Sequence, residues 1–148
     1  MTGRRTCALT PTSRPQRLPE KRRSSKVGGM QGLHLTADLY NCRCAPAWLR
    51  DAGQLGPWCA AAARAAGFAP LGEALATHPG GVSATLVMAG AHVAVHTWPA
   101  HKAVTLDVYA APAGPDAAAR AGLLLQALAA RFAPEWTEQR SLERGGEA

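Results

Sequence analysis

Residues 81–99 read Gly81-Val82-Ser83-Ala84-Thr85-Leu86-Val87-Met88-Ala89-Gly90-Ala91-His92-Val93-Ala94-Val95-His96-Thr97-Trp98-Pro99. The runs 82–88 and 92–98 are rich in β-branched and small apolar residues, which is typical of β-strands. Ala89-Gly90 between them suits a chain reversal, because glycine adopts turn conformations that other residues resist. The stretch therefore predicts two adjacent strands joined by a tight turn.

Further strands are expected on both sides of this hairpin. Residues 32–42 alternate in hydropathy, and their apolar face consists of Leu33, Leu35, Ala37 and Leu39. On the opposite face we expect His34 and Asp38 to be hydrogen-bond partners. Residues 71–78 and 104–109 also read as strands, and a short last strand is expected around Trp136.

Helices are expected in two regions. The alanine-rich run 46–66 favours a helix, and Gly53, Gly56 and Pro57 suggest a break in it, so the run predicts one helix or two short ones. Residues 116–132 predict a helix whose apolar side consists of Ala121, Leu123, Leu124 and Leu128. The order of elements implies an α+β fold, a two-layer sandwich in which helices pack on one face of an antiparallel sheet.

The basic character of the chain is confined to its start. The 148 residues have a formal net charge of +6. Residues 1–29 carry eight of the sixteen Lys and Arg and one acidic residue, a net charge of +7, whereas residues 30–148 carry eight basic and nine acidic residues, a net charge of −1. The domain expected over residues 30–148 is close to neutral, so nothing in it indicates a nucleic-acid-binding surface.

Residues 1–29 are rich in Arg, Ser and Pro, so we expect a disordered basic leader. Two interpretations remain, a basic arm for nucleic acid or an anionic membrane, and an unstructured extension that precedes a true start at Met30. We favour the second, because the leader has no aromatic residue for base stacking. The chain has no apolar run of signal-peptide or membrane-span length, which predicts a cytoplasmic protein without a membrane partner.

Three motifs are specific enough to indicate a family. They are Gly-Leu-His-Leu-Thr-Ala-Asp-Leu-Tyr-Asn-Cys at 32–42, Pro-Gly-Gly-Val-Ser at 79–83 and His-Thr-Trp-Pro at 96–99. Together they resemble the bacterial S-adenosylmethionine decarboxylases, pyruvoyl enzymes of spermidine synthesis, over residues 32 to 143 or so. In that family a strand of this type carries Glu-Ser-His shortly before His-Thr-Trp-Pro, and the chain cuts itself between the Glu and the Ser. The resemblance implies the two-layer fold predicted above.

The resemblance also assigns roles to five positions. Ser83 matches the serine whose hydroxyl assists self-processing, and His96 matches the histidine that protonates during ester elimination. Gly90 replaces the cleavage-side acid, Ala91 replaces the pyruvoyl-forming serine, and Ala111 replaces the cysteine that donates a proton after decarboxylation. The chain is therefore similar to the family in its scaffold motifs and divergent along the reaction path.

Without a serine at position 91 we expect no cofactor. The serine hydroxyl must attack the preceding carbonyl, and the resulting ester eliminates to a pyruvoyl ketone, which the methyl group of Ala91 cannot form. Lys102 is no substitute, because the substrate supplies the amine and the protein must supply the carbonyl. A displaced precursor at Ser83 is a weaker alternative, since a serine in mid-strand lacks the turn geometry of residues 89–91.

A zinc site is the alternative interpretation of the histidines. His92 and His96 project from one face of a strand, and Cys42 or Cys44 would complete the ligand set. The family resemblance accounts for these residues without a metal, and the Cys-x-Cys spacing lacks a second matching pair. We therefore expect no metal.

Two classes of function are compatible with the sequence. The first is a silent homologue in polyamine (spermidine) biosynthesis, which acts as a partner or regulatory subunit, as a homodimer or as a heteromer with an active paralogue, and which could bind S-adenosylmethionine. The second is an active decarboxylase of S-adenosylmethionine, or of a related amino acid, by an unorthodox route. The alanine at position 91 favours the first, and a binding module of unrelated role is the least favoured.

The purified protein is expected to stay one chain of 15.4 kDa, because position 91 has no hydroxyl to start the acyl shift. Intact-mass spectrometry combined with reductive trapping of carbonyl groups checks this. Two fragments separated at the bond between Gly90 and Ala91 would contradict it.

Overall fold

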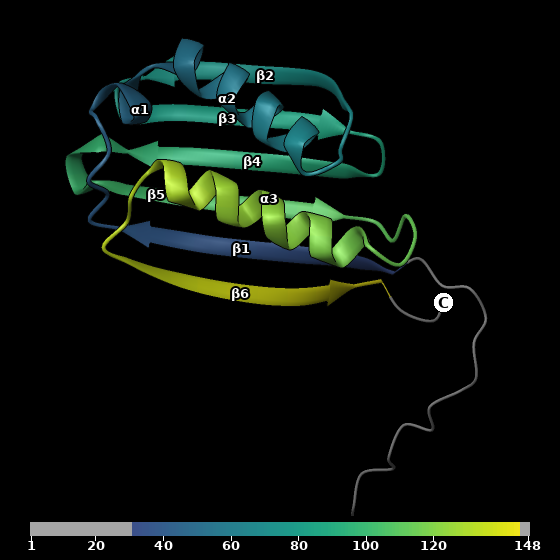
Figure 1. Ribbon diagram of the computed structural model, residues 1–148. Coiled ribbons are helices and arrows are strands. Elements are labelled where there is room, and N and C mark those ends of the chain that lie inside the picture. Colours follow the sequence, from purple (N-terminus) through teal and green to yellow (C-terminus); the bar gives the residue numbers. More distant parts are fainter. Residues whose placement is uncertain (1–30, 146–148) are drawn as a thin grey trace, which may run out of the picture.

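Six strands form one antiparallel sheet in the computed structural model, which describes residues 31–145 (Figure 1). In chain order the elements are β1 (Gly32–Tyr40), α1 (Ala47–Arg50), α2 (Ala52–Ala65), β2 (Pro70–His78), β3 (Gly81–Met88), β4 (Ala91–Trp98), the 3-10 helix η1 (Pro99–His101), β5 (Ala103–Ala110), α3 (Ala117–Arg131) and β6 (Trp136–Arg144). Their order across the sheet is β2-β3-β4-β5-β1-β6. The leader expected over residues 1–29, and Met30, lie outside the described residues.

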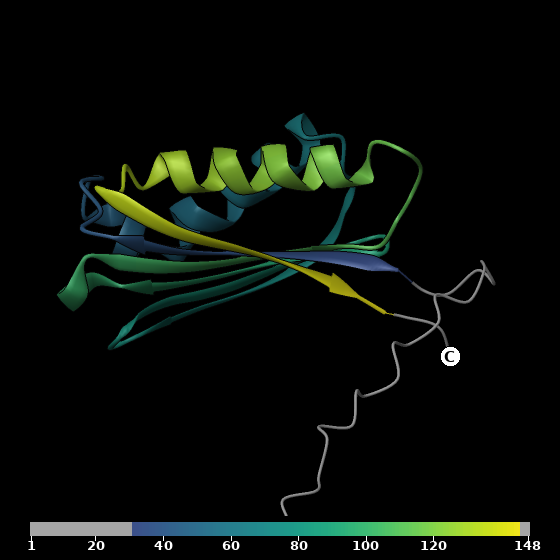
Figure 2. The same ribbon diagram turned by 90° about the horizontal axis from the view of Figure 1, so that it is seen from below.

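The helices lie on one face of the sheet. Helix α2 packs on β2 and β3, and α3 packs on β5 and β1. Figure 2, seen from below, shows both helices on the same side and the other side of the sheet without a covering element among residues 31–145. The predicted two-layer α+β sandwich is confirmed. No helix in this part of the chain is long and apolar enough to cross a membrane.

The core lies between the sheet and the helices. Alternate residues of each central strand face the helices, as the period of two in a strand requires. Buried side chains on β1, β3, β4, β5 and α3 include Leu35, Ala37, Leu39, Val82, Leu86, Val93, Val95, Val104, Leu106, Val108, Ala121, Leu124, Leu125 and Leu128. Burial of each Leu or Val stabilises the fold by about 1.5–3 kcal/mol. The predicted apolar face of β1 is thus correct.

The helical region differs from the prediction in where it breaks. The break falls at Asp51, whose carboxylate accepts a hydrogen bond of 2.8 Å from the Gly53 amide and caps the start of α2. Gly56 and Pro57 lie inside α2, where the proline removes one backbone donor and the helix continues. In α3, Leu123 is 59% exposed, so its assignment to the apolar side was wrong. The buried stripe instead continues through Leu125.

The last strand is longer than expected. Strand β6 has nine residues and pairs with β1 along its full length, from Tyr40 with Trp136 to Gly32 with Arg144. Nearly all of its residues are exposed, and charged residues such as Arg140 occupy it. Exposure explains the miss, because an edge strand without a buried face has no alternation of apolar residues.

Thr97 is the one polar residue buried in the core among residues 31–145. Its Oγ1 accepts a hydrogen bond of 2.8 Å from the Val82 amide and donates one of 2.7 Å to the Leu49 carbonyl. The hydroxyl therefore satisfies a donor of β3 and an acceptor of α1 at once. These two hydrogen bonds connect α1 to the hairpin of β3 and β4.

Thr97→Val is expected to lower the free energy of unfolding by about 2 kcal/mol or more, because each buried group left without a partner costs about 1–3 kcal/mol. Thr97→Ser keeps the hydroxyl and is the matched control. Loss of its one buried methyl group is expected to lower the free energy of unfolding by only about 0.8 kcal/mol. Urea unfolding of both variants measures the difference. An equal loss in the two variants would show that the hydroxyl contributes nothing.

Candidate functional site

Ser83 and His96 lie side by side on the open face of the sheet, the face opposite the helices. The two residues are register partners on β3 and β4. The distance from the Ser83 Oγ to the His96 Nδ1 is 3.0 Å, and the pair is partly buried. A hydroxyl next to an imidazole nitrogen is the arrangement of a nucleophile and its general base. The two retained residues are therefore brought together.

A second histidine contacts the same hydroxyl, and the sequence analysis missed it. The His78 Nε2 lies 3.2 Å from the Ser83 Oγ, and the His78 Nδ1 lies 3.2 Å from the Gly80 amide nitrogen. The register pairs His78 with Gly81 and Ala76 with Ser83, so residues 78 and 83 share a face. This signal was present in the sequence, because a two-residue turn at Pro79-Gly80 fixes that pairing.

Gly90, Ala91 and Ala111 come together at the opposite end of the hairpin. The Gly90 carbonyl accepts a hydrogen bond of 2.8 Å from the Ala111 amide, and Ala91 pairs with Ala110. Gly90 adopts a φ of 65°, which L-residues disfavour. Ala91 is 8% exposed and lies on the helix-facing side of β4. The three replaced positions thus form one local group.

The two groups are separated within the chain. Ser83 pairs with His96 and Met88 pairs with Ala91, so five residue steps along β3 separate the two ends. At about 3.3 Å per residue this is about 17 Å. Neither the Ser83 hydroxyl nor the His96 ring can reach position 91 of the same chain over that distance.

A cavity of about 440 Å³ lies beside the replaced positions. Ala110 and Pro112, on either side of Ala111, line it together with Glu143 and Arg144. Its volume is within the range of small-molecule sites. It offers space for a ligand at this end of the molecule.

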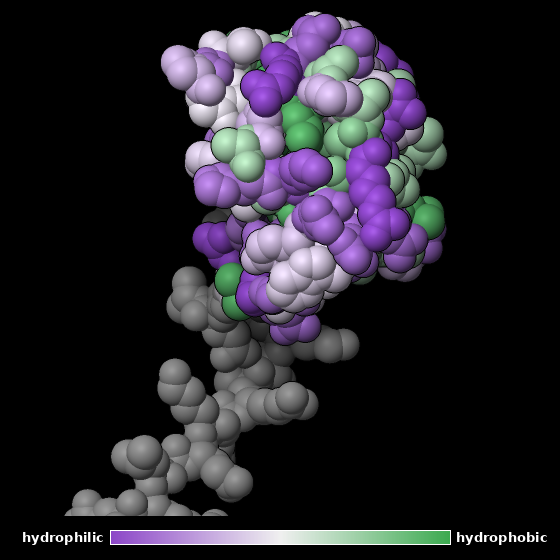
Figure 3. Space-filling model, turned by 90° about the vertical axis from the view of Figure 1, so that its left-hand side faces the viewer, coloured by the Kyte–Doolittle hydropathy of each residue, from purple (hydrophilic) through white to green (hydrophobic). Residues whose placement is uncertain are grey.

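A second cavity, of about 450 Å³, lies at the other end, beside α1 and η1. Arg43, Arg50 and Lys102 line it, and Arg43 forms an ion pair of 3.3 Å with Glu135. Figure 3 faces this end and shows mostly hydrophilic side chains around a small apolar area. The lining of this cavity therefore holds three basic side chains and no acidic one.

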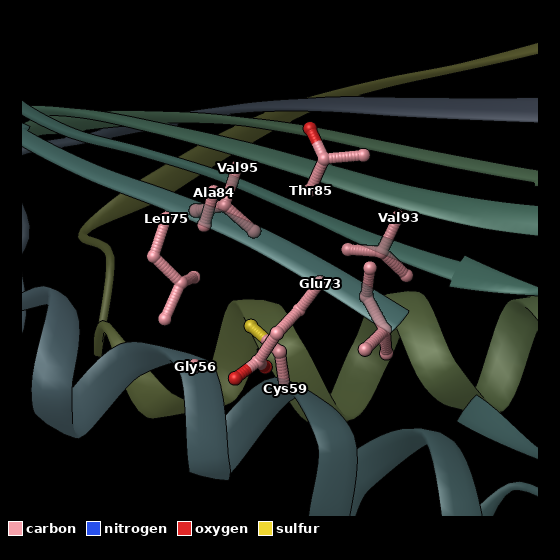
Figure 4. Close-up of a pocket in the computed structure, with 9 residues that line it drawn as sticks. Gly56, Cys59, Glu73, Leu75, Ala84, Thr85, Val93 and Val95 are labelled. Atoms are coloured by element: carbon pink, nitrogen blue, oxygen red, sulfur yellow. The ribbon is translucent and has the colours of Figure 1, made fainter. Parts of the chain in front are cut away.

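Between α2 and the sheet there is only a small gap of about 10 Å³, room for one water molecule (Figure 4). The side chains of Cys59 and Glu73 lie next to each other in it. Burial, and then the nearby Glu73 carboxylate, raise the pKa of the Cys59 thiol to about 12. Cys59 is a packed, neutral thiol.

The zinc interpretation finds no support in the geometry. Within residues 31–145, no three His, Cys, Asp or Glu side chains are grouped as metal ligands. Burial, and then the charge of the nearby Cys44, raise the pKa of the Cys42 thiol to about 11. Burial also raises the pKa of the Cys44 thiol. A zinc ligand must be a thiolate, so raised pKa values oppose metal binding. Cys42 contacts Lys102, at the end of the sheet away from the turn before His92.

The expected pairing of His34 with Asp38 is wrong. His34 Nε2 lies 3.0 Å from Asp107 Oδ1 of β5, and Asp38 accepts a hydrogen bond from Arg140 of β6. Residues 34 and 38 are four apart along one strand, whereas Asp107 comes from a neighbouring strand and reaches His34 across the sheet. Tertiary pairing thus decided the partners.

Comparisons with known proteins agree with the fold and the motifs. A family model described as S-adenosylmethionine decarboxylase matches residues 33–145. The S-adenosylmethionine decarboxylase proenzyme of Parasynechococcus marenigrum (strain WH8102) is 36% identical over 83 residues, which are 54% of this chain and 62% of that relative. The crystal structure of the adenosylmethionine decarboxylase from Aquifex aeolicus VF5 superposes with a TM-score of 0.70 at 21% identity, over 82% of this chain and 96% of the other.

Proposed function

This chain belongs to the S-adenosylmethionine decarboxylase family, and from that premise we propose that it is a silent member of the family, a partner or regulatory subunit in polyamine (spermidine) biosynthesis. It works in the cytoplasm as a homodimer or as a heteromer with an active paralogue. It forms no pyruvoyl group of its own.

The observation that carries this proposal is the methyl group at position 91. Self-processing needs a hydroxyl there, and the resulting ketone is the electron sink for decarboxylation next to an amine. Gly90 lies beside Ala111 in the structure. Neither residue has a side chain that could supply an acid or a proton to position 91. The carboxylate, hydroxyl and thiol that the family has at positions 90, 91 and 111 are therefore all absent here. We infer that the chain lacks the chemical groups for processing while its scaffold is intact.

The Ser83 and His96 pair, by contrast, keeps an ordered hydrogen bond of 3.0 Å. Because the pair lies about 17 Å along the strand from position 91 of its own chain, it can act on such a position only in a second chain. The face that carries it is open, and Val87 and Trp98 on this face are 49% and 43% exposed. These features support an assembly in which this chain lends Ser83 and His96 to a paralogue with an intact Glu-Ser segment.

The second candidate is an active decarboxylase that works by an unorthodox route. The cavity of about 440 Å³ next to Ala110 supports ligand binding, and Glu143 offers a carboxylate to a cationic ligand such as S-adenosylmethionine. No residue in that cavity offers a carbonyl of the required kind. We therefore rank this candidate below the silent partner.

Restoring the replaced groups tests whether the scaffold still supports processing. Gly90→Glu with Ala91→Ser is expected to give slow cleavage between residues 90 and 91, followed by mass spectrometry. The glutamate adopts a positive φ at a cost of about 1–2 kcal/mol, which a folded domain of typical stability tolerates. Adding Ala111→Cys is expected to raise the release of carbon dioxide from S-adenosylmethionine by ~10²- to 10⁴-fold, as for other general acids.

A folded double variant that stays uncut over days would contradict an intact processing geometry. The single variant Gly90→Glu is the control, because it carries the same backbone strain without a hydroxyl at position 91.

Complementation between chains tests the shared site. A chain with the three restoring substitutions and Ser83→Ala has a cleavage segment without its own Ser83, and the unmodified chain has Ser83 without a cleavage segment. Co-expression of the two is expected to cut the first chain, whereas the first chain alone stays intact. Replacing the unmodified chain by its Ser83→Ala variant should abolish the cut. Equal cleavage with and without the unmodified chain would exclude a site shared between chains.

A further inference from the structure

The histidine that the sequence analysis missed, His78, gives the hydrogen-bond chain around Ser83 a direction. The chain of contacts runs from the Gly80 amide to the His78 ring, then to the Ser83 hydroxyl and to the His96 ring. Its first member is a backbone N–H, which can only donate a hydrogen bond. The His78 Nδ1 is therefore the acceptor of this first bond.

This first bond fixes the proton on the His78 ring. A neutral imidazole carries one proton, so a ring that accepts at Nδ1 carries the proton at Nε2. Nε2 then donates to the Ser83 Oγ over 3.2 Å. Because the hydroxyl accepts this bond, its own proton is directed at the remaining partner, the His96 Nδ1 at 3.0 Å.

We propose that His78 is a positioning residue that holds the Ser83 hydroxyl as a donor to the His96 Nδ1. In this state His96 presents an unprotonated nitrogen to the hydroxyl and acts as its base, while its proton stays on Nε2. Without His78 the hydroxyl can turn away, or can accept from a His96 protonated at Nδ1. The proposal rests on the family roles of Ser83 and His96 and adds a third residue to them.

The fold holds His78 for this role. It is the last residue of β2, and the turn at Pro79-Gly80 that follows supplies the amide for its ring. Residue 81 has a φ of 144°, and a Cβ there would lie within 3 Å of the Thr97 Oγ1, so only glycine fits at this turn. The same turn therefore reverses the chain and holds the His78 ring in place through the Gly80 amide.

Nuclear magnetic resonance of the ¹⁵N-labelled full chain tests the direction of the bonds directly. We expect a hydroxyl proton of Ser83 that exchanges slowly with water and couples to the His96 Nδ1 across the hydrogen bond. We also expect the ring proton of His78 on Nε2. A ring proton of His96 on Nδ1 in the unmodified chain would overturn the proposal.

Two substitutions separate positioning from a general structural role. His78→Ala removes the donor and is expected to abolish the protected Ser83 proton. His78→Gln places an amide N–H near the position of Nε2 and is expected to restore it. Because His101 lies in η1 outside this chain of contacts, His101→Ala is the matched control and should change nothing. A Ser83 proton that stays protected in His78→Ala overturns the proposal even if His78→Gln behaves as expected.

The same substitutions in the chain restored at positions 90, 91 and 111 give a functional measurement. We expect His78→Ala to slow self-cleavage by about 10-fold or more, since a displaced catalytic group can cost up to ~10²-fold, and His78→Gln to recover most of the rate. The resonance experiment does not need a chain that processes itself. Absence of cleavage in every restored chain would contradict the processing geometry on which the proposed function rests. That outcome is therefore distinguishable from a failure of the role of His78.

Discussion

The register between β3 and β4 is the constraint on which the functional geometry depends. It pairs Ser83 with His96 at one end and Met88 with Ala91 at the other. A slip of either strand by one residue would turn that strand's own polar side chain, Ser83 or His96, toward the core and its apolar residues to the open face, because side chains alternate along a strand. Thr97 opposes such a shift, since its buried hydroxyl has a partner in both β3 and α1.

This register gives the hairpin of β3 and β4 two chemically different ends. At the Ser83 end three polar side chains form a connected chain of hydrogen bonds, while at the Gly90 end the side chains are methyl groups or a hydrogen. Small residues cost the fold little there, because Gly90 suits a turn with positive φ and Ala91 fits a buried strand position. Small residues at positions 90 and 91 are thus compatible with the turn and the buried strand that the fold places there.

The sequence predicted most of the fold because its signals are local. Alternation in β1, the glycine turns and the alanine-rich helix each depend on neighbouring residues, and the structure confirms the layers built from them. The misses have separate causes. The exposed β6 has no buried face, the break at Asp51 depends on a side-chain cap, and Leu123 lies one position away from the buried stripe.

For the functional site, the sequence by itself determined which chemical groups are present: a hydroxyl at Ser83, an imidazole at His96 and no hydroxyl at Ala91. Only the tertiary structure decided which of them meet. Residues 83 and 91 are closer in sequence than residues 83 and 96, yet strand pairing joins the second pair and separates the first. It also brought His78 to Ser83 and Asp107 to His34. The physical reason is that a strand extends by about 3.3 Å per residue, whereas a hairpin brings residues far apart in sequence to about 5 Å from each other.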